Sequence, residues 1–161
     1  MFIFSIRASS IKFFAILALT FAILLGLMLS GNTVPASGAS VGEVNFSDVK
    51  TEDDRVAFIE QFGLRVKSAA TDASDFVMPE NFDRVILGYN QIQKAQGLDL
   101  TKYQKKRVTH YAYEVTNYDY NGTVYVNLLV YRNRIIAADI SSAADGGFVY
   151  GLLDFDTTRL K

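Results

Sequence analysis

The chain has no cysteine and only one histidine, His110. Without cysteine there are no disulfides, no thiolate zinc or iron–sulfur sites, no cysteine nucleophile and no lipid anchor on a thiol. One imidazole excludes a metal site built from several histidines. The segment Asp119–Gly122 resembles the start of a calcium loop, but the other acidic ligands of that loop are absent. We expect no metal and no cofactor, with an incidental calcium at Asp99, Asp119 or Asp145 as the open alternative.

Charge is also sparse, with 16 basic and 17 acidic residues in a chain of 161. Arg7 and Lys12 are the only charges before Glu43, so the rest of the chain carries 14 basic against 17 acidic residues, a net charge of −3. That balance gives no general attraction to nucleic acid, and we expect no nucleic-acid partner. The length, once a leader is subtracted, leaves one compact domain and excludes an enzyme with separate cofactor and substrate domains.

A hydrophobic run from Phe13 to Leu29 contains neither charge nor proline. A helix over residues 12–29 is about long enough to cross the hydrocarbon core of a membrane. Arg7 and Lys12 precede it, so the positive-inside bias keeps the N-terminus in the cytoplasm and sends the rest outward. We expect residues 1–30 to be an uncleaved single-pass anchor.

Small residues around Ala36–Gly38 leave a cleaved signal peptide, and therefore secretion, as the alternative. The Gly-, Ser- and Ala-rich segment 31–45 is typical of a flexible spacer. Residues 46–161 are then the exported domain. The lack of cysteine is consistent with a bacterial cell surface.

Two helices are predicted in this domain. The first begins at Thr51, a capping residue followed by acidic side chains, and ends at Gly63. Residues 64–69 alternate in polarity and predict a short strand. Pro79 and Glu80 open the second helix, which Gly97 ends. Its apolar face consists of Phe82, Val85, Ile86, Tyr89 and Ile92.

The most informative stretch surrounds Asn121 and Gly122, a pair typical of a two-residue type I′ hairpin. Counting outward from this turn places Tyr113 opposite Val130 on an apolar side. The same count places Val115, Asn117, Val126 and Leu128 on that side.

A second turn is expected as a three-residue loop at Arg132–Arg134, with Asn133 near the left-handed region. This choice puts Ile136, Ala138 and Ile140 on the apolar side, whereas a two-residue loop would put Asp139 there. The last strand is predicted over residues 148–155.

The order of elements predicts an α+β fold. We expect an antiparallel β-meander sheet with two helices packed on one face, preceded by one N-terminal hydrophobic helix, either transmembrane or signal.

The opposite, polar face of this sheet is the first candidate site. It combines flat aromatic rings with hydrogen-bonding groups, a mixture suited to binding a peptide, a sugar or another protein. The candidate binding residues are Thr116, Tyr118, Tyr125, Asn127 and Asp139. An ordinary solvated or covered face is the alternative interpretation.

Catalysis has one candidate pair, Glu114 and Asp139, which are expected on the same face. Their spacing is compatible with the roughly 5–9.5 Å between glycosidase carboxylates. A Ser-His-Asp arrangement is not expected, because His110 and Ser141 fall toward different ends of the strands.

A basic cluster is expected at one end of the meander, where it could meet anionic lipid headgroups or wall polymers. Its members are Lys102, Lys105, Lys106, Arg107, Arg132 and Arg134. The alternative is a solvated sheet edge whose lysines discourage pairing with other strands.

Several short strings of the chain, in a fixed order and spacing, carry a family resemblance. They comprise Tyr89, Asn90, Gln96, Gly97, Leu98, Asp99, Leu100, Tyr103, Tyr111, Tyr113, Glu114, Val115, Asn117, Tyr118, Ile136, Asp139, Ile140, Gly147 and Phe148. From about Arg55 to Leu152 the chain resembles the bacterial domain of unknown function 4830 family.

The chain departs from the family pattern at two places. It has Ala137 and Ala138 instead of a Gly-Gly pair, and Lys105 and Lys106 instead of a Gly-Lys pair, so a close approach of backbone to ligand is not expected there. The resemblance implies an anchored extracytoplasmic α+β domain and brings no activity with it.

Taken together, these observations predict a non-catalytic binding or interaction module of the bacterial cell envelope, tethered to the membrane through residues 12–29. Its partner would be an envelope protein or polymer. The alternatives are a small envelope hydrolase using Glu114 and Asp139, and a purely structural module that dimerises through a sheet edge.

Overall fold

The computed structural model describes residues 44–161. The expected anchor, residues 1–30, and nearly all of the expected spacer, residues 31–45, lie outside the described residues. Within residues 44–161, no helix has the length and apolar character needed to cross a membrane.

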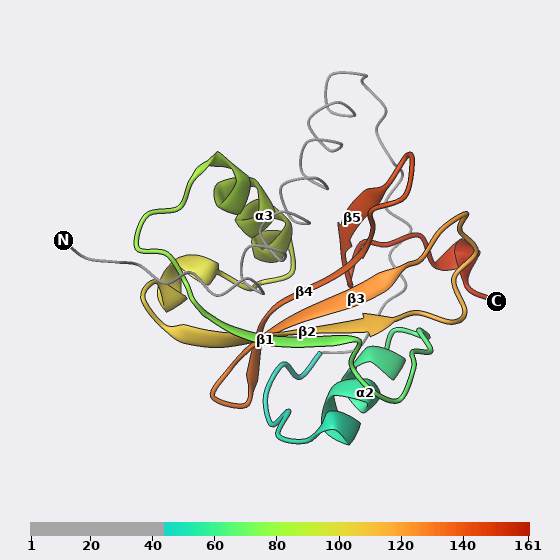
Figure 1. Ribbon diagram of the computed structural model, residues 1–161, viewed down its shortest axis with the longest axis horizontal. Coiled ribbons are helices and arrows are strands. Elements are labelled where there is room, and N and C mark those ends of the chain that lie inside the picture. The colour runs from blue at the N-terminus through green and yellow to red at the C-terminus, as the bar shows by residue number, and fades with distance from the viewer. Residues whose placement is uncertain (1–43) are drawn as a thin grey trace.

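A five-stranded antiparallel sheet forms the centre of the domain, with its strands side by side in chain order (Figure 1). The strands are β1 (Asp72–Val77), β2 (Arg107–Glu114), β3 (Tyr125–Tyr131), β4 (Arg134–Ser142) and β5 (Phe148–Gly151). The predicted α+β class and antiparallel meander are confirmed. The strand expected over residues 64–69 is wrong, because only Val66 pairs there, in an isolated bridge with Val115.

The two helices, α2 (Glu52–Glu60) and α3 (Arg84–Ala95), lie on opposite faces of the sheet (Figure 1). Phe58 of α2 belongs to one buried cluster with Leu128, whereas Tyr89 of α3 belongs to another with Leu129. The prediction of both helices on one face was therefore wrong. The central strands β3 and β4 carry apolar side chains on both faces, and each apolar face needs a cover.

Local capping explains where the helices begin and end. Thr51 and Asp54 form the predicted capping box before α2, and Gly63 follows with a φ of 76°. Asp83 caps α3, so this helix begins later than Pro79 and Glu80 had indicated. Gly97, with a φ of 78°, follows its C-terminus in the left-handed region that glycine adopts at low cost.

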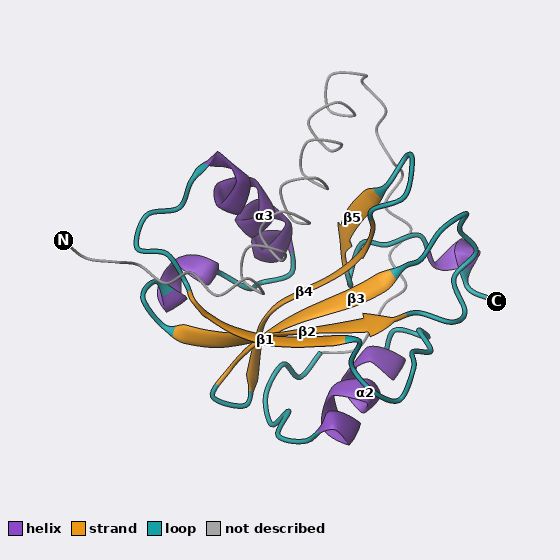
Figure 2. Cartoon of the chain, in the orientation of Figure 1, coloured by secondary structure: helices purple, strands orange, loops and turns teal. Residues whose placement is uncertain are grey.

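The connection between β2 and β3 is much longer than the predicted hairpin at Asn121 and Gly122 (Figure 2). Tyr113 pairs with Val126, four residues from the predicted Val130. Because this offset is even, the residues of β2 and β3 still face the predicted sides. The loop residues beyond β2 do not follow the strand alternation.

The turn between β3 and β4 contains two residues instead of three. Arg132 and Asn133 both have positive φ, 48° and 62°, as a type I′ turn requires. A bulge between Leu129 and Val130 then restores the predicted pairing of Leu128 with Ala138 and of Asn127 with Asp139. One consequence is that Ile136 packs on the α3 side, whereas Ile135 occupies the α2-side position that was predicted for Ile136.

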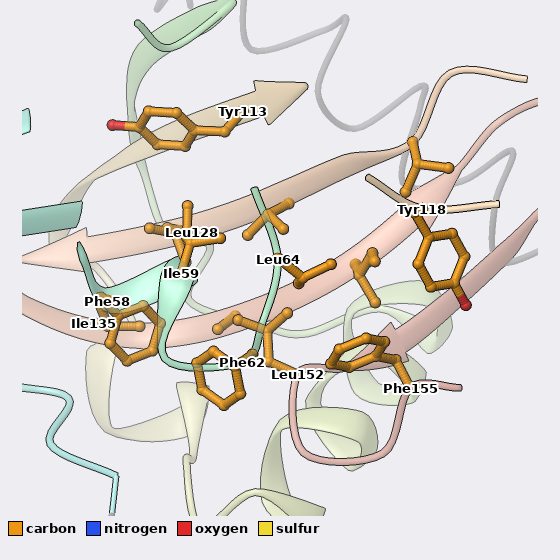
Figure 3. Close-up of a cluster of buried hydrophobic side chains, with 14 of the residues drawn as sticks. Phe58, Ile59, Phe62, Leu64, Tyr113, Tyr118, Leu128, Ile135, Leu152 and Phe155 are labelled. Atoms are coloured by element: carbon orange, nitrogen blue, oxygen red, sulfur yellow. The ribbon is translucent and has the colours of Figure 1, made fainter. Parts of the chain in front are cut away.

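The larger core lies between α2 and the sheet (Figure 3). Its fully buried members include Ile59, Leu64, Tyr113, Leu128, Ile135 and Leu152. The aromatic rings of Phe58 and Phe62 meet edge to face, with centroids 5.4 Å apart. The rigid sheet backed by this core fixes the positions of the polar side chains on the α3 face.

Candidate functional site

The predicted polar-aromatic surface is not formed. Tyr118 packs in the α2-side cluster, with its ring 5.8 Å from that of Phe148. Thr116 is exposed on the loop after β2, and its hydroxyl donates to the carbonyl of Arg65. Asn127 and Asp139 do lie on the predicted face, but α3 covers Asp139. The prediction failed because it extended the strand alternation into the long loop and left this face without a helix.

Asp139, at the centre of the α3 face, is only 3% exposed. Its Oδ1 accepts a hydrogen bond of 2.6 Å from the Tyr89 hydroxyl of α3. Its Oδ2 accepts a hydrogen bond of 2.8 Å from Asn127 Nδ2. Burial raises the pKa of Asp139 to about 6, although hydrogen bonds from Tyr89, Asn127 and Ser141 favour the ionised form. Burial also raises the pKa of Tyr89, so this hydroxyl acts as a donor.

The polar contacts continue from Asp139 across the sheet. Asn127 Nδ2 also donates to Ser141 Oγ at 2.9 Å, and Asn127 Oδ1 lies 3.1 Å from His110 Nε2. His110 Nδ1 lies 3.4 Å from a carboxylate oxygen of Asp72 on the edge strand β1. Burial lowers the pKa of His110, and therefore the neutral imidazole predominates at neutral pH.

We call this set the polar network: Tyr89, His110, Asn127, Asp139 and Ser141. It brings His110 and Ser141 closer than predicted, since both contact the same amide, Asn127. The sequence did not predict that Tyr89 belongs to this network, because the helical spacing assigned Tyr89 to the apolar face of its helix. The signal that the sequence did offer for the network was the placement of Asn127 and Asp139 opposite each other on the polar side of two neighbouring strands.

Two glutamines fasten α3 to the sheet beside the polar network. Gln93 Oε1 accepts from the Ala138 amide, and Gln96 Nε2 donates to the Ala138 carbonyl, each at 2.9 Å. Strand β5 ends at Gly151, which pairs with Asp139, so the glutamines take over the hydrogen bonds of the missing strand residue. They thereby satisfy the backbone groups of a buried strand position, as a neighbouring strand would. These bonds make α3 a fixed cover of the network.

The candidate carboxylate pair is separated by the intervening strand β3. Glu114 on β2 and Asp139 on β4 lie two strands apart and two residues out of register, a backbone separation of about 12 Å. Glu114 Oε2 is 2.7 Å from Lys67 Nζ, whereas Asp139 is enclosed by the polar network. The structure does not bring the two carboxylates together.

The basic residues, in contrast, gather at one end of the sheet. Thr109 pairs with Val130, so Arg107 lies beside the turn that contains Arg132. Helix η1 (Leu100–Tyr103) brings its own basic residue to this end, because the Tyr103 and Tyr131 rings are 5.5 Å apart. We call this set the basic end: Lys102, Lys105, Lys106, Arg107, Arg132 and Arg134, all exposed.

The chain enters the folded domain next to the basic end. The Ile135 amide donates to the Phe46 carbonyl at 2.8 Å, and the Val49 amide donates to the Asn133 carbonyl at 3.0 Å. Arg134 Nη1 donates to Ser47 Oγ at 2.8 Å. The first described residues are thus held against the start of β4.

Within residues 44–161, no three side chains from histidine, aspartate and glutamate are grouped so as to hold a metal ion. Asp99 is a cap for η1, and hydrogen bonds from Thr101 and Asn90 lower its pKa to about 2. Asp119 pairs with Lys161 Nζ at 2.7 Å, which lowers the pKa of that carboxyl.

Comparison with known families gives a match over the central part of the chain. The model of the family described as "Domain of unknown function (DUF4830)" matches residues 58–140, slightly more than half of the chain. The chain belongs to the DUF4830 family. The matched part of this DUF4830 domain runs from the end of α2 into β4 and contains the basic end and all of the polar network except Ser141. No curated protein and no solved structure matches the chain.

Proposed function

We propose that this protein is a non-catalytic interaction module of the bacterial cell envelope, anchored in the membrane through residues 12–29 with its folded domain outside the cytoplasm. The observation that carries the non-catalytic part is the enclosure of Asp139. Both of its carboxylate oxygens accept hydrogen bonds from the fold itself, and α3 is fastened over it. A general acid or base has to lie within hydrogen-bond reach of its substrate.

The hydrophobic run supports the anchoring part. It extends from Phe13 to Leu29 without a charge, and basic residues occur only on its N-terminal side for a long stretch. In this proposal the surface available to partners is the exposed part of the domain, and the basic end gathers six of its 14 basic residues.

The alternative is a small envelope hydrolase in which Asp139 acts with Glu114. A carboxyl pKa near 6 is favourable for acid–base catalysis, and this observation keeps the alternative in view. Such an enzyme would need α3 to move away from Asp139. An Asp139→Asn variant with an intact fold would lose all hydrolytic activity if the alternative were correct, and would keep partner binding in our proposal.

Membrane extraction of the full chain tests the anchoring directly. After expression in a bacterium, the protein should stay in the membrane fraction through alkaline carbonate washing, and a protease added outside the cell should digest its domain. A matched variant with Leu19→Arg and Leu24→Arg should lose membrane retention, because a charge at the centre of a spanning helix is costly. Release of the wild-type chain by carbonate, or its protection from external protease, would refute the anchoring.

A further inference from the structure

The basic end concentrates positive charge on a domain that is otherwise acidic. Residues 44–161 contain 14 basic and 16 acidic residues, and six of the basic ones lie at this end. Of these six, Lys105 is paired with Glu80 at 2.5 Å. Asp48, which follows Ser47 where the chain enters the domain, lies 4.0 Å from Lys50, a lysine outside this set. Only one of the six cations therefore has an ion-pair partner among the described residues.

Five of the six cations, namely Lys102, Lys106, Arg107, Arg132 and Arg134, form no ion pair with the described residues. They come from two separate parts of the chain, residues 102–107 from η1 to the start of β2, and residues 132–134 at the β3–β4 turn. The pairing of β2 with β3 and the contact of Tyr103 with Tyr131 bring these two parts together. A multivalent cationic surface is thus built by the fold and not by one run of sequence.

The position of this surface relative to the chain entry is equally specific. Ser47 is hydrogen-bonded to Arg134 at the basic end, and Leu29 closes the hydrophobic run only a short distance earlier in the sequence. Residues 30–43 can span at most about 50 Å even when fully extended. If the run is anchored as proposed, the basic end is the part of the domain tied most closely to the membrane surface.

We infer that the basic end binds the anionic phosphate headgroups of the membrane in which the chain is anchored, and so holds the domain against that surface in one orientation. This inference rests on the proposed function. Arginine guanidinium groups bind phosphate oxygens through paired hydrogen bonds, and lysines add point charges. Each cation near an anionic leaflet favours the bound state by a factor of about five, so two engaged cations already give more than a tenfold preference.

The test uses the full chain in lipid nanodiscs, made either of phosphatidylglycerol or of phosphatidylcholine alone. Lysine side chains are acetylated briefly, and the rate at each site is read by peptide mass spectrometry. Lys102 and Lys106 should react roughly tenfold more slowly in the anionic discs. Lys94 and Lys161 serve as internal controls and should react equally in both. About 0.5 M NaCl, where the Debye length is near 4 Å, should abolish the difference.

Two double variants distinguish an effect of the basic end from an effect of net charge alone. Arg107→Gln with Arg132→Gln should remove most of the protection of Lys102 in anionic discs. Arg65→Gln with Arg159→Gln changes the net charge by the same amount away from the basic end and should leave the protection intact. Equal acetylation rates in both lipids, or equal loss of protection in both variants, would overturn the inference.

Two further arms keep the possible failures apart. A chain that does not enter nanodiscs at all refutes the proposed anchoring, whereas a chain that enters but shows no protection refutes only the lipid contact. A soluble glycerol-phosphate polymer added to phosphatidylcholine discs tests the other phosphate source. Protection that arises only with the polymer would assign the basic end to an envelope polymer and overturn the lipid inference.

Discussion

Replacing Asp139 with asparagine should make the domain more stable at neutral pH. The folded-state pKa of about 6 is raised from an ordinary value of 3.8, so the folded protein binds more protons than the unfolded chain between these values. The stabilisation that comes from protonated Asp139 is fully present below about pH 4 and is lost as the pH rises through about 6. Above that pH, the buried carboxylate costs about 3 kcal/mol.

Asparagine keeps the shape of the side chain without the charge. Its Oδ1 can still accept from the Tyr89 hydroxyl, but its Nδ2 would face the Nδ2 of Asn127, and this mismatch costs about 1–2 kcal/mol. We therefore expect a net gain of about 1–2 kcal/mol in the free energy of unfolding near pH 8 and a net loss of about 1–2 kcal/mol near pH 4, where only the mismatch remains. Urea titrations of residues 44–161 can follow tyrosine fluorescence, since the chain has nine tyrosines and no tryptophan.

The contribution of His110 to stability depends on pH in the opposite sense, so it has to be separated from that of Asp139. Burial lowers the pKa of His110 from the ordinary value of 6.5, so the stability it contributes is present above that value and is lost as the pH falls through its folded pKa. As the pH rises toward about 6, the stability lost through Asp139 is therefore partly offset by the stability gained through His110. His110→Gln keeps a donor toward Asn127 and should expose the full slope due to Asp139. If Asp139→Asn is destabilising by the same amount at every pH, the burial argument is wrong.

Three further experiments test the contacts that hold the helices and the cap of α2. Gly151→Ala should lower the melting temperature in calorimetry, because the new Cβ would lie 2.6 Å from Gln96 Cδ, and Gln96→Ala in the same chain should relieve part of the loss. Tyr89→Phe should cost about 1–3 kcal/mol near pH 8 in urea titrations and raise the pKa of Asp139 further, so an unchanged midpoint would argue against the bond. Thr51→Ala should cost about 1 kcal/mol through loss of the capping box, with Ser as the control replacement that retains the cap.

The sequence predicted the central strands well because their alternation is strong. Val126 and Leu128 lie on the α2 side as expected, and Asn127 pairs with Asp139. The same strands also contain Leu129 and Ala137, which are apolar residues on the face taken to be polar. These two residues were the local indication that a second layer covers that face.

The remaining errors have two physical causes. Strand β1 carries Asp72, Ser74 and Asp75, and an edge strand with so many polar residues has no clear strand pattern in the sequence. Tyr118 could not be placed by counting, because its loop pairs with Leu160 near the C-terminus, a contact that no local rule predicts. The basic end could be located from the sequence because it depends only on which strand ends are adjacent.

The glutamine contacts at Ala138 tie the exposure of the buried strand β4 to the attachment of α3. While Gln93 and Gln96 occupy the Ala138 amide and carbonyl, the main-chain groups of β4 next to the end of β5 are not bare. Detachment of the helix would uncover these groups together with the ionisable Asp139, and a strand from another molecule could then pair there. The edge of β4 at Ala138 is consequently closed by two side-chain amides of the α3 segment and not by a further strand.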